Sequence, residues 1–310
     1  MSDLLDLEYL DNYFKEGDVK ISGPWRLTVW KKVNSPPCYL FSEEHANEGS
    51  CPEEKDISIV SRELLNNTEN VHVFIEHFIH ALEVSNVKLT EKEACSSKSK
   101  AILNNMRNCL EVVRVNSPVF KKRIHFIDPR MDIVSVLPDG KLFEAITHYA
   151  EHLVSQNDIG GALMTLYEAF IHPLLSVVPD KFGVKGRMTG VMEKFRDGMT
   201  DTQRTFFESK WNTDIIQRVK KLSKMYVQMQ KSSSIDNMEN LKLEYTGMVN
   251  KFMDMWLLAQ FFVSQNGGMT GALVYAGSLH SLNFESYLKD FGYSRTKLRE
   301  NKSLAACLML

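Results

Sequence analysis

The sequence predicts an α/β fold with a mostly parallel sheet flanked by helices and a long helical insertion. Short apolar runs typical of strands alternate with amphipathic stretches over the first 130 residues and again after residue 270. Strands that alternate with helices imply crossover connections, which favour parallel pairing. Residues 140–265 instead have apolar side chains every three or four positions. We therefore expect one α/β domain over residues 1–310, with a helical insertion or subdomain at 140–265.

The first part of the chain contains three strand-like runs. After a helical pattern over residues 4–14, strands are expected at 25–30 and 38–41, with Asn34-Ser-Pro-Pro37 between them as a turn. A charged helix over residues 53–65 then leads into the β-branched run at 71–75, which is typical of a buried strand.

The remaining elements follow the same two patterns. Residues 89–100 are polar and predict a surface loop, followed by a helix at 101–113 and a strand at 123–127 that stops at Asp128-Pro129. A strand is expected at 271–276 and a helix at 282–291, and residues 305–310 form a last apolar strand or a buried tail. Within the insertion, helices are expected at 142–154, 162–175, 215–229 and 241–262.

Composition excludes several classes of protein. The chain is 44% hydrophobic and 25% charged, which are ordinary globular values. A net charge of -2 gives no general attraction to nucleic acid. The start of the chain lacks the order of a signal peptide, and the longest apolar stretch, residues 255–263, is too short to cross a bilayer. We therefore expect a cytoplasmic protein.

The five cysteines carry no pairing signal. They are widely spaced, odd in number and without a C-x-x-C pair, so neither a disulfide framework nor a zinc knuckle is indicated.

Ionisable residues follow all four strands that are predicted to be buried. Ligands bind beyond the carboxyl ends of strands in open parallel sheets, because the loops there converge on one edge. A single ionisable residue after a strand has ordinary structural explanations. Ionisable residues after four strands at the same edge of the sheet indicate a functional site. The residues are Glu43 and His45, Glu76, His125 and Asp128, and His280.

Two chemical schemes use the same side chains. His45, Glu76 and His280 could bind a divalent metal such as Zn, Mn or Co, which lowers the pKa of a bound water. Alternatively, a histidine and a glutamate could act as general base and acid on water without a metal. In either scheme the candidate catalytic residues are Glu43, His45, Glu76 and His280.

A second group is assigned to the substrate. Arg130 suits an anionic group through its bidentate guanidinium, although an ion pair with Asp128 or Asp132 explains it equally well. His125 and Asp128 are placed with Arg130 as candidate substrate-binding residues. His72, His77 and His80 are weaker candidates, and His148 and His152 fit a solvated helix face.

The segment Gly277-Ser-Leu-His280 resembles a motif of the Tiki/TraB group, which includes erythromycin-esterase-like and haem-binding ChaN-like proteins. That group has two G-x-x-H motifs with a strand-ending Glu between them. Here Glu76 matches the Glu, Phe291-Gly292-Tyr293 resembles the family's G-Y ending, and Ser42-Glu-Glu-His45 matches the first motif with Ser42 in place of Gly. A longer pattern around these residues is similar to uncharacterised proteins of large cytoplasmic DNA viruses.

The resemblance implies a hydrolase of an ester or amide, acting on a small molecule or peptide, in the host cytoplasm or the virion. The alternative is a catalytically inactive viral structural or host-interaction protein that binds a partner through the helical insertion. Haem binding is a third, less favoured expectation and would need an open apolar cleft.

The last four residues of the sequence have the form of a prenylation box. Cys307-Leu-Met-Leu310 ends in Leu, and Arg295, Lys297, Arg299 and Lys302 precede it. Membrane binding is expected only if Cys307 is lipidated.

Overall fold

The computed structural model describes residues 2–15, 20–44, 55–78, 90–96, 102–129, 195–218, 235–301 and 307–309. Between these ranges it also describes residues 149, 152–153, 155–156, 158, 161–162, 165, 221, 224–225 and 228. The chain divides into two compact units. Residues 1–128 with 260–310 form the first, here called the sheet unit, and residues 129–259 form the second, the helical unit.

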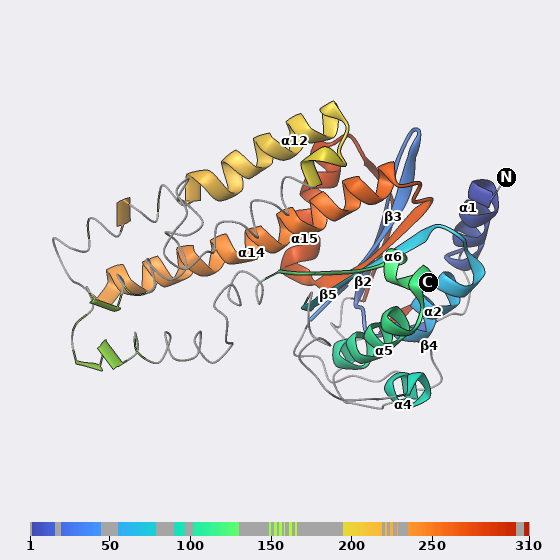
Figure 1. Cartoon of the computed structure of the whole chain (residues 1–310), viewed down its shortest axis with the longest axis horizontal. Helices are drawn as coiled ribbons and strands as arrows, with labels where there is room; N and C mark the ends of the chain where they lie inside the picture. The colour runs from blue at the N-terminus through green and yellow to red at the C-terminus, as the bar shows by residue number, and fades with distance from the viewer. Residues whose placement is uncertain are drawn as a thin grey trace. The chain divides into compact units, whose positions relative to one another are not determined.

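The sheet unit is built on six strands in the order β6-β5-β7-β3-β2-β8 (Figure 1). Strands β6, β5, β7 and β3 pair in parallel, while β2 is antiparallel to both β3 and β8. The predicted α/β fold with a mostly parallel sheet is thereby confirmed. The strands are β2 Arg26–Lys32, β3 Ser35–Glu43, β5 Val71–Phe78, β6 Ile124–Asp128, β7 Gly271–Gly277 and β8 Ser294–Glu300.

One face of the sheet carries the main hydrophobic core. Alternate strand residues point to this face, among them Phe41, Val73 and Tyr275. They pack against Leu10, Leu64 and other apolar side chains of three helices, which Figure 1 shows together on one side of the sheet. These helices are α1 Ser2–Tyr13, α2 Ile57–Asn67 and α5 Ile102–Asn116.

The opposite face packs against α15 Ser278–Asp290 and the end of α14. Phe74 of β5 contacts Phe261, and Phe261 contacts Phe284 of α15, with ring centroids 6.2 and 5.5 Å apart. Both faces of the central strands are therefore buried, which explains why β7 is an uninterrupted apolar run.

The described part of the sheet unit also includes three short strands and two small helices. Strand β1 Lys20–Ser22 pairs with β4 Lys55–Asp56 and with β9 Cys307–Met309 in a separate three-stranded sheet. The helices are α4 Glu91–Ser96 and α6 Pro118–Arg123. Leu308 of β9 is buried in the main core, and Cys307 pairs with Ser22 of β1.

Two local predictions were wrong. The prolines at 36 and 37 lie in β3, and the turn is the two-residue segment Val33-Asn34, with Asn34 at φ 56°. Asn tolerates this left-handed conformation, and the prolines fit because β3 pairs with β7 only from Cys38 onward. The expected surface loop at 89–100 contains α4, whose first turn is capped by Thr90 and Glu93.

The cysteine prediction also needs correction. Cys95 of α4 and Cys109 of α5 form a disulfide across 14 positions. The spacing left no signal because the bond joins two helices that become neighbours only in the fold. Cys38 is free and buried.

The helical unit contains α12 Asp201–Trp211, the π-helix η2 Asn212–Ile216 and most of α14 Ile235–Asn266. A capping box between Thr200 and Gln203 begins α12. Trp211 packs edge-on against Phe252, with ring centroids 5.2 Å apart. The helices predicted at 142–154 and 162–175 lie largely outside the described residues.

No helix within the described ranges is both long and apolar enough to span a bilayer.

Candidate functional site

Four parallel strands end at the same edge of the sheet. Glu43 at the end of β3 is paired in register with Gly277 at the end of β7. Strand β5 lies on the other side of β7, and Phe78 of β5 is paired with Asp128 of β6. The strand order therefore brings Glu43, Glu76, Asp128 and the segment leading to His280 to one edge, here called the carboxyl edge.

Glu43 is held by a tyrosine of the neighbouring strand. Its side chain is buried, and Tyr275 Oη donates a hydrogen bond of 2.5 Å to Glu43 Oε2. Tyr275 itself is fully buried in the core. A carboxylate that receives a short phenolic hydrogen bond in these surroundings has a fixed orientation.

The contact leads to a first testable prediction. Tyr275→Phe removes a hydrogen bond to a buried carboxylate, which is expected to cost about 1–3 kcal/mol of unfolding free energy. Urea denaturation followed by circular dichroism measures this loss. Tyr149→Phe, at a half-exposed tyrosine of the helical unit, is the matched control. Equal stability of the two variants would contradict the assigned role of Tyr275.

Glu76 lies where β5 departs from regular pairing. The register with β6 shifts between Ile75 and Phe78, as in a β-bulge, which re-aims the side chains next to it. Glu76 Oε2 accepts a 2.8 Å hydrogen bond from the backbone N–H of Gly277. The carbonyl of Glu76 accepts a 2.5 Å hydrogen bond from Arg107 Nε on α5. Both the carboxylate and the backbone of Glu76 are therefore fixed.

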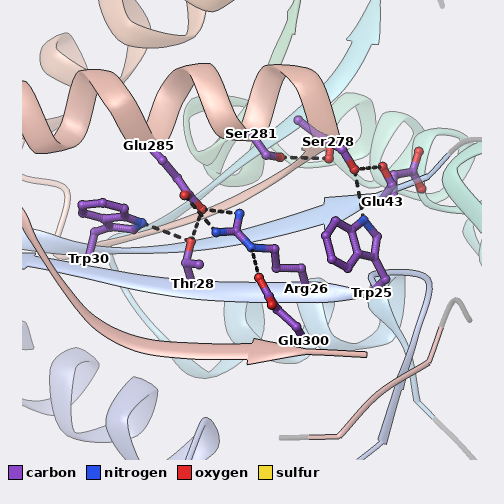
Figure 2. A network of polar contacts seen from close by, with 10 residues as sticks. Trp25, Arg26, Thr28, Trp30, Glu43, Ser278, Ser281, Glu285 and Glu300 are labelled. Atoms are coloured by element: carbon purple, nitrogen blue, oxygen red, sulfur yellow. Dashed lines mark hydrogen bonds and ion pairs between the residues drawn. The ribbon is translucent and has the colours of Figure 1, made fainter. Parts of the chain in front are cut away.

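The Gly277–His280 segment begins a helix, not a loop. Helix α15 starts at Ser278, four residues before the predicted start, so the buried His280 lies in its first turn. Ser278 Oγ accepts a 3.0 Å hydrogen bond from Trp25 Nε1 and lies 2.9 Å from the carbonyl oxygen of Glu43, an arrangement that Figure 2 shows. Ser278 Oγ is also 3.0 Å from Glu44 Oε1. The first turn of α15 is thus attached to the end of β3.

Ser42 stands where the G-x-x-H motif described above has glycine. It pairs with Arg26 on one side and with Ala276 on the other as an ordinary strand residue. The described residues with positive φ are Gly23, Asn34, Gly268 and Gly292, so the backbone at 42 does not require glycine. The cost lies in the side chain, because Ser42 Oγ is buried without a hydrogen-bond partner among the described residues.

A buried pair that the sequence reasoning missed lies next to Glu76. His77 is part of β5, and its Nε2 is 3.3 Å from Glu111 Oε2 on α5. The His77 ring also packs edge-on against Phe126, and Glu111 Oε1 is buried without a partner within the described ranges. Reasoning from strand ends cannot find Glu111, since it lies in the middle of a helix.

The predicted substrate-binding residues that the structure describes, His125 and Asp128, do not lie together. Asp128 ends β6 and is buried at the carboxyl edge. His125 lies three residues earlier, about 10 Å along the strand, on the face that packs against α14. His45 and Arg130 lie outside the described residues.

His125 belongs to a histidine pair instead. His72 Nδ1 is 2.9 Å from His125 Nε2, and the His125 ring stacks on Phe74 at 4.6 Å. Burial lowers the pKa of His72 to about 4, with a further contribution from Arg123. Burial, together with His72 and Arg114, lowers the pKa of His125 to about 3. Both imidazoles are therefore neutral at pH 7 and share one hydrogen bond.

Within the part of the chain that the structure describes, no three His, Cys, Asp or Glu side chains are grouped to hold a metal ion. Of the three predicted metal ligands, the structure describes Glu76 and His280, and His45 lies outside the described residues.

Comparisons with known proteins add no family. No family model matches the chain, and no curated protein or solved structure is significantly similar to it. Function must therefore be argued from the geometry of the carboxyl edge.

Proposed function

We propose that the chain is a hydrolase of an ester or amide bond in a small-molecule or peptide substrate, with its catalytic residues at the carboxyl edge. One observation carries the proposal. Glu43 ends β3 and Glu76 lies two residues before the end of β5, on the two strands that flank β7. Both are buried, and both accept hydrogen bonds from β7, Glu43 from Tyr275 and Glu76 from the backbone N–H of Gly277.

The arrangement suits acid and base catalysis. Preorganised carboxylates and an imidazole on rigid elements can remove a proton from attacking water and return one to the leaving group. We assign these roles to Glu43, Glu76 and His280, with His45 as a further candidate that follows Glu44 in the sequence. Asp128 and Arg130 remain the candidate substrate contacts, and His125 is left out because of its position within β6.

The test is hydrolysis of chromogenic esters and peptide amides by the full chain. Glu76→Gln and His280→Gln are each expected to lower kcat/KM by about 100-fold or more, which is the usual loss when a general acid or base is removed. Glu8→Gln, at an exposed residue of α1, and His152→Gln, at an exposed residue of the helical unit, are matched controls. Circular dichroism establishes that each variant is folded.

Chelation separates the two chemical schemes. Loss of activity with EDTA, restored by Zn, Mn or Co, would assign His45, Glu76 and His280 to a metal, whereas activity that persists would assign them to metal-free acid and base catalysis. Unchanged activity in both site variants would rule out the carboxyl edge as the catalytic site. A wild-type chain inactive on every substrate would support the alternative of an inactive protein that binds a partner through residues 140–265.

A further inference from the structure

Within the connection between β5 and α5, the structure describes residues 90–96, which include α4. The connection follows Phe78, two residues after Glu76, and α4 at Glu91–Ser96 precedes α5. Helix α5 then supplies Arg107 to the carbonyl of Glu76 and Glu111 to His77. Cys109 lies between these two residues on α5 and is bonded to Cys95 of α4.

Apart from the disulfide, the described contacts of α4 include one buried side chain and one partly exposed ion pair. Six residues are too few for a helix to be stable by itself. Ala94 is buried. Arg62 Nη2 of α2 is 2.6 Å from Glu91 Oε1, but the Arg62 and Glu91 side chains are 35% and 44% exposed. This ion pair therefore contributes little to stability. The contacts between Thr90 and Glu93 are local to the segment. Among the described residues, the disulfide is the covalent link between α4 and α5.

The two sulfur atoms differ in environment. Cys109 is fully buried in the main core, whereas Cys95 is partly exposed and packs at the margin of that core. A thiolate can therefore approach Cys95 first. Cys38 does not compete as a thiolate, because burial raises the pKa of its thiol.

We propose that the Cys95–Cys109 disulfide is a redox-sensitive clasp. In the oxidised chain it fixes α4 to α5 beside the carboxyl end of β5, and reduction by a dithiol releases α4. A reductant thiolate attacks Cys95 Sγ, and the Cys95–Cys109 bond breaks while Cys109 leaves as a thiolate and takes up a proton. The second reductant thiol then attacks the mixed disulfide, which frees the Cys95 thiol and leaves the reductant as a cyclic disulfide. Two electrons pass from the dithiol to the protein.

The clasp does not depend on the hydrolase proposal, so its test uses no substrate. The full chain is equilibrated with oxidised glutathione or with dithiothreitol, alkylated, and mapped by mass spectrometry. Hydrogen exchange is then measured in both states. Reduction is expected to speed exchange over residues 90–96 by about 10-fold or more, because local opening no longer requires a covalent link to break, and to leave α2 unchanged.

Two variants make the result specific. Cys95→Ala removes the partly exposed partner and is expected to exchange like the reduced chain whether or not dithiothreitol is present. Cys38→Ala, at a buried free cysteine, is the matched control and is expected to respond to dithiothreitol as the wild type does. Free thiols at 95 and 109 after oxidation, pairing of either with another cysteine, or equal exchange of residues 90–96 in both states would overturn the clasp.

Discussion

Arg26→Met is expected to destabilise the sheet unit by about 3–5 kcal/mol, the loss typical of removing one partner from a buried ion pair. Arg26 and Glu285 are both buried, and the guanidinium contacts both carboxylate oxygens, at 2.6 and 3.0 Å (Figure 2). Thr28 Oγ1 donates a further 2.7 Å hydrogen bond to Glu285 Oε1, and Arg26 Nε donates to Glu300 at 2.8 Å. Without Arg26, Glu285 remains as a buried charge with one neutral donor.

Urea denaturation followed by circular dichroism measures this loss of stability. Two further variants show whether the loss comes from the buried ion pair or from the charge left unpaired. Lys31→Met breaks the exposed pair with Asp11, whose side chains are 44% and 54% exposed, and should cost less than about 1 kcal/mol. The double variant Arg26→Met with Glu285→Met removes both charges and should recover most of the loss, because a buried pair gains little over apolar packing. A double variant less stable than Arg26→Met alone would show that the pair itself, not the orphaned charge, dominates.

The free energy of unfolding is expected to fall steeply between pH 6.5 and pH 4 because of the histidine pair. The pKa of His72 is about 4 and that of His125 about 3 in the folded chain, both below the ordinary value of 6.5. The unfolded chain therefore takes up protons first as the pH falls, which favours unfolding. The stabilisation is fully present above pH 6.5 and is lost as the pH falls toward the folded values. His72 alone accounts for about 3 kcal/mol between pH 7 and pH 4.

Urea denaturation at pH 7, 5.5 and 4.5 tests this dependence. The double variant His72→Phe with His125→Leu cannot take up these protons and should show a flatter profile, leaving the slope due to carboxylates. His152→Gln, at an exposed histidine, should retain the wild-type profile. The same slope in the double variant and the wild type would exclude the pair as its source.

Local sequence patterns predicted the central strands of the sheet, but they did not predict which strands pair with each other. The β-branched run at Val71–Phe78 and the apolar run at Gly271–Gly277 are recognisable because both faces of these strands are buried. Nothing in a single sequence says that β7 lies between β5 and β3, since pairing across some 200 positions leaves no local trace. Strand β8 was missed because it is a charged edge strand with Arg295, Lys297 and Arg299 at alternate positions.

The candidate site divides in the same way. Glu43 and Asp128 could be predicted because each ends a recognisable strand, and Glu76 because it directly follows the β-branched run at 71–75. The residues that hold them could not, because Tyr275 resembles a core residue and Arg107 resembles an exposed helix residue in the sequence. His77 was ranked as a weaker candidate because its partner, Glu111 of α5, lies 34 positions later in the sequence, and no local pattern reveals that contact.

The position of β7 also constrains how the chain acquires its fold. Strands β3 and β5 both precede the helical unit, yet the strand that joins them follows it. A growing polypeptide therefore presents two apolar strand edges for the whole time needed to synthesise residues 129–270, and such edges promote association between chains. Completion of the sheet depends on contacts far apart in sequence, which are slow to form. A chain cut before Gly271 should accumulate as aggregate, whatever the stability of its helices.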